Sequence, residues 1–276
     1  MLPVVIDLPN SRVAAALLAA LALPLALPAP AAAEEAGILS VVAEESAFVV
    51  RLSDGSEMRS VDLVGAVLHV EGEEGPLAIR IDAVEVERDS GLVLHTLSVR
   101  RATGDFEPWC APDTRGRRVG FPLAGRARPD GTLAEDPERF ELVCTSSARG
   151  QCVAMGYAPW RRAREGRPLA AAFEACVRML RADYCGDGAT ATREGVAVEA
   201  YDELGVRQPA EDPALAFEAG WTEEGAVCVH HARVPAAATP ESLEARCPRL
   251  AGHTGAACTE ASARAAGALV FSRSRP

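Results

Sequence analysis

Apolar residues alternate with polar ones along much of the first third of the chain, which predicts antiparallel β-strands over residues 38–101. Apolar side chains recur at every second position from Leu77 to Ile81, and after Ala83 their phase shifts by one. Such a shift is typical of a β-bulge, which adds one residue to one strand of a pair. Polar turns separate the runs, and no cysteine occurs among them. We therefore expect a cysteine-free β region over residues 34–104.

The pattern changes after residue 105, where one amphipathic helix is predicted. After Pro168, five residues at helical spacing form an apolar stripe: Phe173, Cys176, Val177, Leu180 and Tyr184. The other expected elements are a strand over 195–201, a hairpin of 215–221 with 226–230, a helix from Thr239 and a closing strand over 267–272. The sequence thus predicts a β-rich α+β fold. Its antiparallel region is followed by a disulfide-stapled mixed domain, with one or two helices, over residues 105–276.

The first 33 residues have the order of a secretory signal peptide. A polar start with the single basic residue Arg12 precedes an apolar run over 13–27, and small residues lead up to Ala33. The alternative is an uncleaved membrane anchor, but three prolines near the end of the run would interrupt a spanning helix. We expect cleavage after Ala33. The product would be exported to the periplasm or the cell exterior and have no membrane span.

The eight cysteines all lie in the second part of the chain: Cys110, Cys144, Cys152, Cys176, Cys185, Cys228, Cys247 and Cys258. An even number in an exported protein indicates up to four disulfides, and we expect all eight to be paired. No two cysteines have the CxxC spacing of a zinc ribbon or a thioredoxin-like site. The connectivity stays open, because eight cysteines allow on the order of a hundred pairings.

Charge and composition exclude several classes of function. All 28 basic residues are arginine, against 39 acidic residues, which gives a net charge of −11. Because a chain of this charge repels phosphate backbones, we expect no nucleic-acid partner. The absence of lysine excludes a lysine Schiff base and a P-loop. The only asparagine is Asn10, inside the expected signal peptide, so the exported chain has no N-glycosylation acceptor.

After residue 105, five segments occur in this order: 121–125, 140–144, 151–160, 175–188 and 217–228. The fourth contains the motif Ala182-Asp183-Tyr184-Cys185. Together they resemble the ADYC domain family of exported, functionally uncharacterised bacterial proteins, over roughly residues 105–272. The resemblance implies export. It supplies no catalytic or binding residues.

The loop after the predicted helix partly matches a calcium-binding loop. Its acidic positions one, five and twelve are filled by Asp183, Asp187 and Glu194. Positions three and nine carry Cys185 and Ala191, which offer no oxygen ligand. We therefore favour a glycine turn without metal, and we expect no cofactor. If the motif is architectural, Asp183→Asn keeps the side-chain shape and should fold almost normally.

Two further sets of residues have competing interpretations. His230, His231 and His253 could form a metal or general-base cluster, but adjacent residues of a strand point to opposite faces, so ordinary histidines are favoured. The triplet Asp89-Ser90-Gly91 occurs once, whereas aspartic proteases need two carboxylates, so a hairpin turn is favoured.

Three aromatic residues, Tyr157, Trp160 and Trp221, could line a carbohydrate or peptide groove, although core packing is the commoner role. No nucleophile, base and acid can be combined from sequence spacing alone. We therefore expect a non-enzymatic binding or cell-envelope module with an unknown envelope or extracellular ligand. The alternative is a secreted hydrolase-like enzyme whose Asp, Glu and His residues converge only in the fold. A pocket with facing carboxylates would favour the enzyme, and an aromatic surface would favour binding.

The expected leader gives a first testable prediction. When the chain is produced in a bacterial host, the intact mass of the exported protein should correspond to residues 34–276. Recovery of the full-length mass from the membrane fraction would contradict this prediction.

Overall fold

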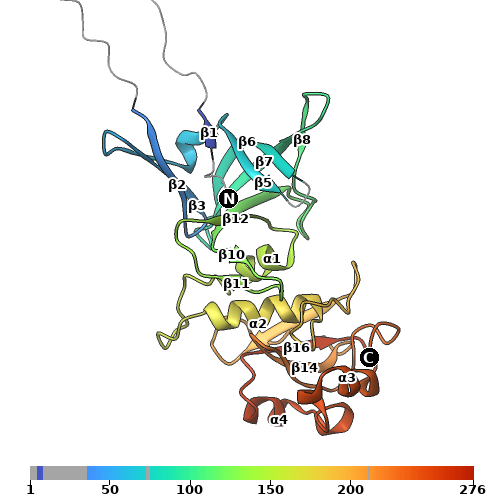
Figure 1. The fold of residues 1–276 in the computed structure, drawn as a ribbon. Helices are drawn as coiled ribbons and strands as arrows, with labels where there is room; N and C mark the ends of the chain where they lie inside the picture. Colours follow the sequence, from blue (N-terminus) through green and yellow to red (C-terminus); the bar gives the residue numbers. More distant parts are fainter. Residues whose placement is uncertain (1–4, 9–35, 73–74, 211) are drawn as a thin grey trace, which may run out of the picture.

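The computed structural model describes residues 5–8, 36–72, 75–210 and 212–276. The apolar run of the expected leader and the bond after Ala33 lie outside these ranges. Strands form the upper part of the molecule, and a helix-covered sheet forms the lower part (Figure 1). Over the ranges just given, no helix has the length and hydropathy needed to cross a membrane.

The upper part contains two antiparallel sheets. The larger has the order β1 (Val5–Asp7), β5 (Val67–Gly72), β6 (Gly75–Val86), β7 (Val93–Arg100), β9 (Val119–Ala124) and β12 (Phe140–Cys144), with β8 (Phe106–Pro108) paired to β7. The smaller consists of β2 (Ile38–Glu44), β3 (Ala47–Leu52) and β4 (Glu57–Arg59), followed by the 3-10 helix η1 (Ser60–Leu63). Their shared core includes Phe48, Leu63, Leu68, Ile79 and Leu97, all without solvent exposure.

The register of the larger sheet confirms the predicted bulge. The pairing of β6 with β7 shifts between Ile81 and Ala83, where the apolar phase changes. The same sheet continues past residue 104, because β9 pairs with β7 and with β12. Strands from both sides of that position therefore share one sheet.

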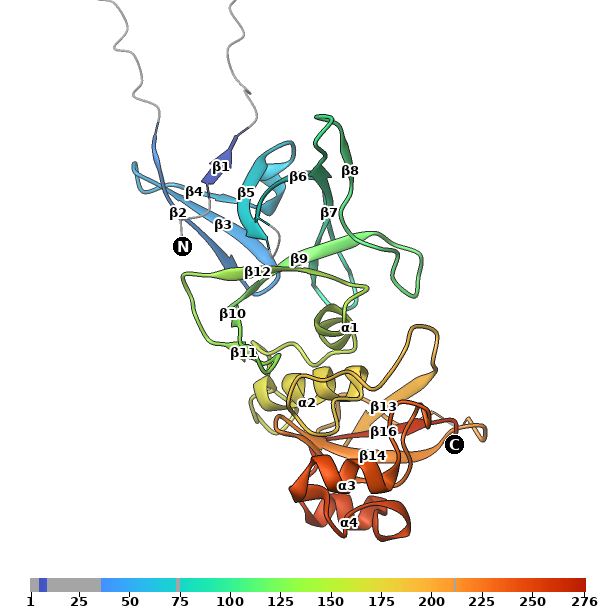
Figure 2. The same ribbon diagram turned by 45° about the vertical axis from the view of Figure 1, so that its right-hand side comes forward.

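The lower part is built on one helix and one sheet. Between the two parts lie β10 (Arg126–Ala127), β11 (Leu133–Ala134) and α1 (Ala148–Ala154), as Figure 2 shows. Helix α2 (Ala170–Arg181) packs against the sheet β13 (Val198–Asp202), β16 (Val270–Ser274), β14 (Ala216–Thr222) and β15 (Gly225–Val229). The remaining elements are α3 (Pro240–Arg246), η2 (Pro248–Leu250), η3 (Gly255–Ala257) and α4 (Glu260–Ala265).

These elements confirm the β-rich α+β class and the antiparallel sheets. The hairpin around residues 222–225 and the closing strand are present. The helix at Thr239 begins with its hydroxyl accepting a hydrogen bond from the Ser242 backbone N–H. The described residues contain four α-helices, more than the one or two expected. Helices α1 and α4 are six or seven residues long, which is too short to give a periodic apolar pattern in the sequence.

All eight cysteines are paired, as expected, and the structure supplies the connectivity. The bonds are Cys110–Cys144, Cys152–Cys176, Cys185–Cys247 and Cys228–Cys258. The second bond joins α1 to α2, and the third joins the loop after α2 to the end of α3. Two of the four bonds therefore fix the surroundings of α2.

Each residue of the ADYC motif has a structural contact at the C-terminal end of α2. Ala182 ends the helix in the left-handed conformation, with φ of 51°. The Asp183 carboxylate is buried, forms an ion pair with Arg178 and accepts hydrogen bonds from the backbone N–H groups of Gly186 (2.9 Å) and Gly188 (3.0 Å). These contacts close the loop after the helix.

The next residue, Tyr184, connects α2 to the sheet. Its hydroxyl donates to Glu218 at 2.8 Å and accepts from the Arg233 backbone N–H at 2.9 Å. Burial and the adjacent Glu218 carboxylate raise the pKa of Tyr184 above its usual value, so the hydroxyl stays protonated. Its ring stacks on Trp221, with 5.2 Å between the centroids.

A close backbone approach holds the motif against the turn between β14 and β15. The Tyr184 carbonyl accepts from the Ala226 N–H at 3.0 Å. A Cβ atom on Gly186, whose φ is +72°, would lie 1.8 Å from the Glu224 carbonyl oxygen. Only glycine fits both constraints. The motif therefore sets the position of the β14–β15 turn.

The buried ion pair corrects one expectation about the motif. Asp183→Asn was expected to fold almost normally, but this change leaves the buried Arg178 guanidinium without its carboxylate. We predict a loss of about 3 to 5 kcal/mol in the free energy of unfolding, measured by chemical denaturation. Asp187→Asn is the matched control: Asp187 lies exposed in the same loop, and its change should reduce stability by less than about 1 kcal/mol. Equal stabilities for the two variants would contradict the prediction.

Candidate functional site

A cavity of about 400 Å³ lies where the upper and lower parts meet. Its walls come from the β2–β3 turn, the end of β9, the segment at β11, the loop after α1, the first turns of α2 and the β14–β15 turn. The walls therefore come from elements spread over most of the chain. A junction of this kind is a common place for a ligand site.

The residues that line the cavity are of two kinds. The apolar and aromatic ones are Leu123, Ala124, Leu133, Pro159, Trp160, Ala170, Ala171 and Phe173. The remaining four are glutamates: Glu45, Glu135, Glu174 and Glu223. Among the described residues, no arginine or histidine lines the cavity. The cavity is therefore both aromatic and acidic.

Two lining residues carry a buried polar atom for which the described residues provide no partner. Within the part of the chain that the structure describes, neither Trp160 Nε1 nor Glu174 Oε2 has a hydrogen-bond partner. The other carboxylate oxygen of Glu174 accepts from the Leu133 backbone N–H at 2.9 Å. Burying an unpaired donor or acceptor costs about 1 to 3 kcal/mol. Three more atoms of this kind occur among the described residues away from the cavity: His95 Nε2, Arg149 Nε and Glu199 Oε2.

Glu174 has a perturbed ionisation. Burial raises the pKa of its carboxyl, and the hydrogen bond from Leu133 and the charge of Arg149 oppose this effect. A shift of this kind, in a cavity, marks a candidate functional residue.

Glu45 reaches the cavity through an unusual backbone conformation. It lies in the turn between β2 and β3 with φ of 55°. Side-chain-bearing residues rarely adopt the left-handed region, where glycine or asparagine is favoured. Strained residues of this kind cluster at ligand sites.

The structure separates the three aromatic candidates. Trp160 lines the cavity, whereas Tyr157 and Trp221 are fully buried in the core. The Tyr157 hydroxyl donates to Asp202 at 2.6 Å, and the Trp221 indole donates to the Ser272 hydroxyl at 2.9 Å. Of the three, Trp160 alone faces space that a ligand could occupy.

The residues of the calcium-loop pattern do not converge. The Asp183 carboxylate is already bound by Arg178 and two backbone N–H groups, and Asp187 accepts from the Ala189 N–H. Glu194 is exposed. Across the described ranges, no group of three His, Cys, Asp or Glu side chains is arranged to hold a metal ion.

The histidines contact separate partners. His230 Nδ1 lies 3.0 Å from the Cys258 carbonyl oxygen, and His231 Nε2 lies 3.0 Å from the Ser274 hydroxyl. The third, His253, uses its carbonyl to accept from the Val229 N–H. None of them lines the cavity.

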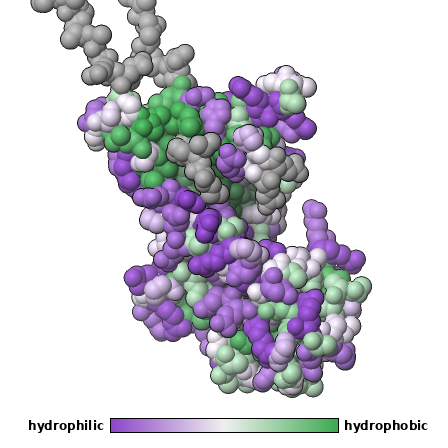
Figure 3. All heavy atoms as spheres, in the orientation of Figure 1, coloured by the Kyte–Doolittle hydropathy of each residue, from purple (hydrophilic) through white to green (hydrophobic). Residues whose placement is uncertain are grey.

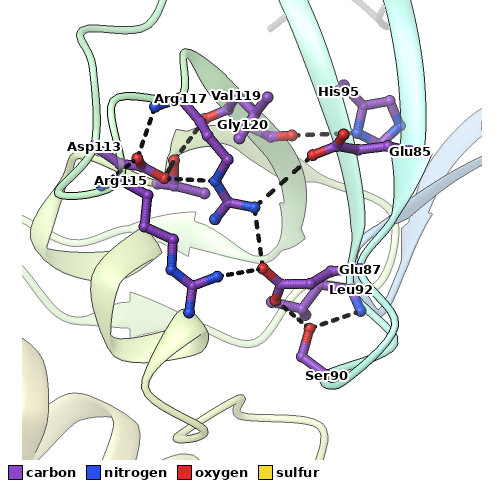
Figure 4. Close-up of polar contacts among 11 residues, drawn as sticks. Glu85, Glu87, Ser90, Leu92, His95, Asp113, Arg115, Arg117, Val119 and Gly120 are labelled. Atoms are coloured by element: carbon purple, nitrogen blue, oxygen red, sulfur yellow. Dashed lines mark hydrogen bonds and ion pairs between the residues drawn. The ribbon is translucent and has the colours of Figure 1, made fainter.

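Residues 89–91 form a hairpin turn beside a cluster of paired charges, shown in Figure 4. Arg117 lies between Asp113, at 3.2 Å, and Glu87, at 3.0 Å. The Ser90 hydroxyl donates to Glu87, and together with Arg117 it holds the pKa of that carboxyl below its usual value. These charges are paired with one another, so we interpret the cluster as a structural contact that joins the segment at Glu87 to the segment at Asp113 and Arg117.

A second hollow, of about 380 Å³, lies beside β16 and is lined in part by Phe217, Glu260 and Arg273. Its polar groups already have partners: Glu260 accepts from the Tyr201 hydroxyl at 2.6 Å and lies 3.7 Å from Arg273. The junction cavity is therefore the stronger candidate, because its four glutamates have no arginine beside them among the described lining residues.

Sequence reasoning proposed Trp160, with Tyr157 and Trp221, as a binding residue and did not propose the glutamates of the cavity. Glu174 lies next to Phe173 of the apolar stripe, and an acidic residue at the border of such a stripe was the one available signal. Glu45, Glu135 and Glu223 lie in turns or loops far apart in sequence, and only the fold brings them together.

Comparison with known proteins gives one match. No curated protein and no solved structure matches the chain. The family model described as the ADYC domain matches residues 60–235, nearly two thirds of the chain. That range includes the strands β5 to β7 of the upper sheet, all four motif residues and every lining residue of the cavity except Glu45. The chain belongs to the ADYC domain family.

Proposed function

We propose that the chain is exported, that its first 33 residues are removed and that it works in the periplasm or outside the cell. The signal-peptide pattern of the leader supports this proposal. Four disulfides support it as well, because they persist in oxidising compartments.

We propose further that the exported protein is a non-enzymatic binding module, and that the junction cavity binds a small organic cation or a basic side chain of a peptide. The observation that carries this proposal is the lining of the cavity, which combines the Trp160 side chain with four glutamates and, among the described residues, has no arginine or histidine.

The chemistry of the lining fits a cation better than other ligands. Indole and phenyl rings attract cations through their quadrupoles, by about 0.5 to 2 kcal/mol per contact. Carboxylates add charge complementarity, and four of them repel an anionic ligand. A guanidinium group suits this site because it is planar, stacks on aromatic rings and donates several hydrogen bonds.

A hydrolase is the second candidate, because one observation favours it. The raised pKa of Glu174 suits a general acid, and another glutamate of the cavity could serve as base or nucleophile. In that case Glu174→Gln would abolish turnover of a chromogenic glycoside or ester. The binding proposal predicts that the wild-type protein turns over neither.

Calorimetric titration with N-acetylarginine amide tests the binding proposal. The isosteric N-acetylcitrulline amide, which is neutral, is the matched ligand control. Glu174→Gln and Trp160→Leu should each weaken binding of the arginine ligand about tenfold, the equivalent of about 1.4 kcal/mol. Glu138→Gln, at an exposed glutamate that does not line the cavity, should leave the affinity unchanged. Equal affinity for the two ligands would contradict the proposal.

The pH dependence follows from the ionisation of Glu174. Because the pKa of this carboxyl is raised, it becomes protonated at a higher pH than an ordinary glutamate as the solution is acidified. Affinity for the arginine ligand should therefore fall as the pH drops through this raised pKa. Glu174→Gln should lose that component. An identical pH profile in the variant would show that Glu174 does not contact the ligand.

A further inference from the structure

The outer strand of the larger sheet comes from the part of the chain that we propose is removed on export. Strand β1, Val5–Asp7, pairs antiparallel with β5, and its central residue Ile6 lies opposite Leu68. Ile6 is 5% exposed and belongs to the core of the upper part. Cleavage after Ala33 therefore removes a strand and a core side chain together.

The surface left by this removal has a defined chemistry. The backbone N–H and C=O groups of β5 that β1 had paired would become free along an edge of the sheet. The space vacated by the Ile6 side chain would expose apolar core residues of the same cluster, which includes Phe48 and Leu68. An exposed edge beside an apolar hollow is the usual receptor for an added β-strand.

Polar and apolar neighbours add specificity to this edge. The carboxylate of Asp7 lies 2.8 Å from His69 Nε2 on β5. The same upper part has exposed apolar residues on β2, on η1 and just after η1, namely Ile38, Leu39, Val61 and Val64. Figure 3 shows apolar residues gathered over this region, beside β2. The surroundings thus favour an apolar strand that carries an acidic residue.

We propose that the processed protein binds an extended segment of a partner polypeptide along the outer edge of β5, in the place of β1. The partner strand runs antiparallel to β5, with a branched apolar residue in the position of Ile6 and, next to it and opposite Val67, an acidic residue whose side chain reaches His69. The residues of β1 indicate which partner sequence would bind, because they occupy the edge of β5 in the unprocessed chain. This proposal rests on the proposed removal of residues 1–33.

The probe is a labelled synthetic peptide with the sequence of residues 3–9, titrated by fluorescence anisotropy into exported protein whose mass corresponds to residues 34–276. We expect saturable binding at one peptide per chain. The peptide with Ile6→Asp should bind at least tenfold more weakly. Protein carrying His69→Glu should bind the original peptide more weakly and regain affinity for a peptide with Asp7→Lys. His69 is half-exposed, so this variant should fold.

Three results would overturn the proposal, and they are distinguishable. Processed protein that shows no saturable binding, or whose binding ignores both Ile6→Asp and His69→Glu, would overturn it alone. If the exported protein had the full-length mass, both this proposal and the proposed removal of residues 1–33 would be overturned, because β1 would stay paired with β5. A dimer of processed protein that the peptide dissociates would assign the edge to a second copy of the chain.

Discussion

The fold depends on the pairing of charges that are buried at the C-terminal end of α2. Asp183 is paired with Arg178, and Glu218 is paired with Arg233 at 3.1 Å, all four being almost fully buried. Arg233 also donates to the Met179 carbonyl at 2.9 Å, so it holds the last turn of the helix. Because a buried charge is tolerated only with its partner in place, the Arg178–Asp183 pair fixes the loop after α2, and the Glu218–Arg233 pair fixes the arginine that ties α2 to β14. The ADYC motif supplies the residues that close this arrangement.

The two ends of α2 differ in a way that locates the candidate site. At the C-terminal end the buried charges Arg178 and Asp183 are paired, whereas near the N-terminal end no described residue bonds the buried Oε2 of Glu174. Since the same helix carries both, fixing its C-terminal end also fixes where Glu174 lies. The β14–β15 turn, held by the motif loop, brings Glu223 to the same cavity. The architectural role of the motif and the proposed binding role of the cavity are therefore linked through α2.

Local patterns in the sequence predicted local structure well. The phase shift after Ala83 predicted the bulge, the apolar stripe predicted α2, and Thr239 predicted the start of α3. Contacts between distant segments could not be predicted, because spacing along the chain does not report them. The partner of Asp183, the disulfide connectivity and the convergence of Glu45 with Glu223 all belong to this class. Trp160 could be proposed as a binding residue, but only the fold distinguishes it from the core residues Tyr157 and Trp221.

The central claim is that a cation binds in the junction cavity against Trp160. The chain has three tryptophans, and their indole N–H groups give separate signals in a ¹H–¹⁵N spectrum of the exported protein. Assignment by Trp160→Phe identifies the cavity signal. On addition of N-acetylarginine amide, the account predicts that the Trp160 signal moves, since the cation lies against its side chain, while those of Trp109 and the buried Trp221 stay in place. A titration in which the Trp160 signal does not move, or in which only Trp109 responds, would contradict the account.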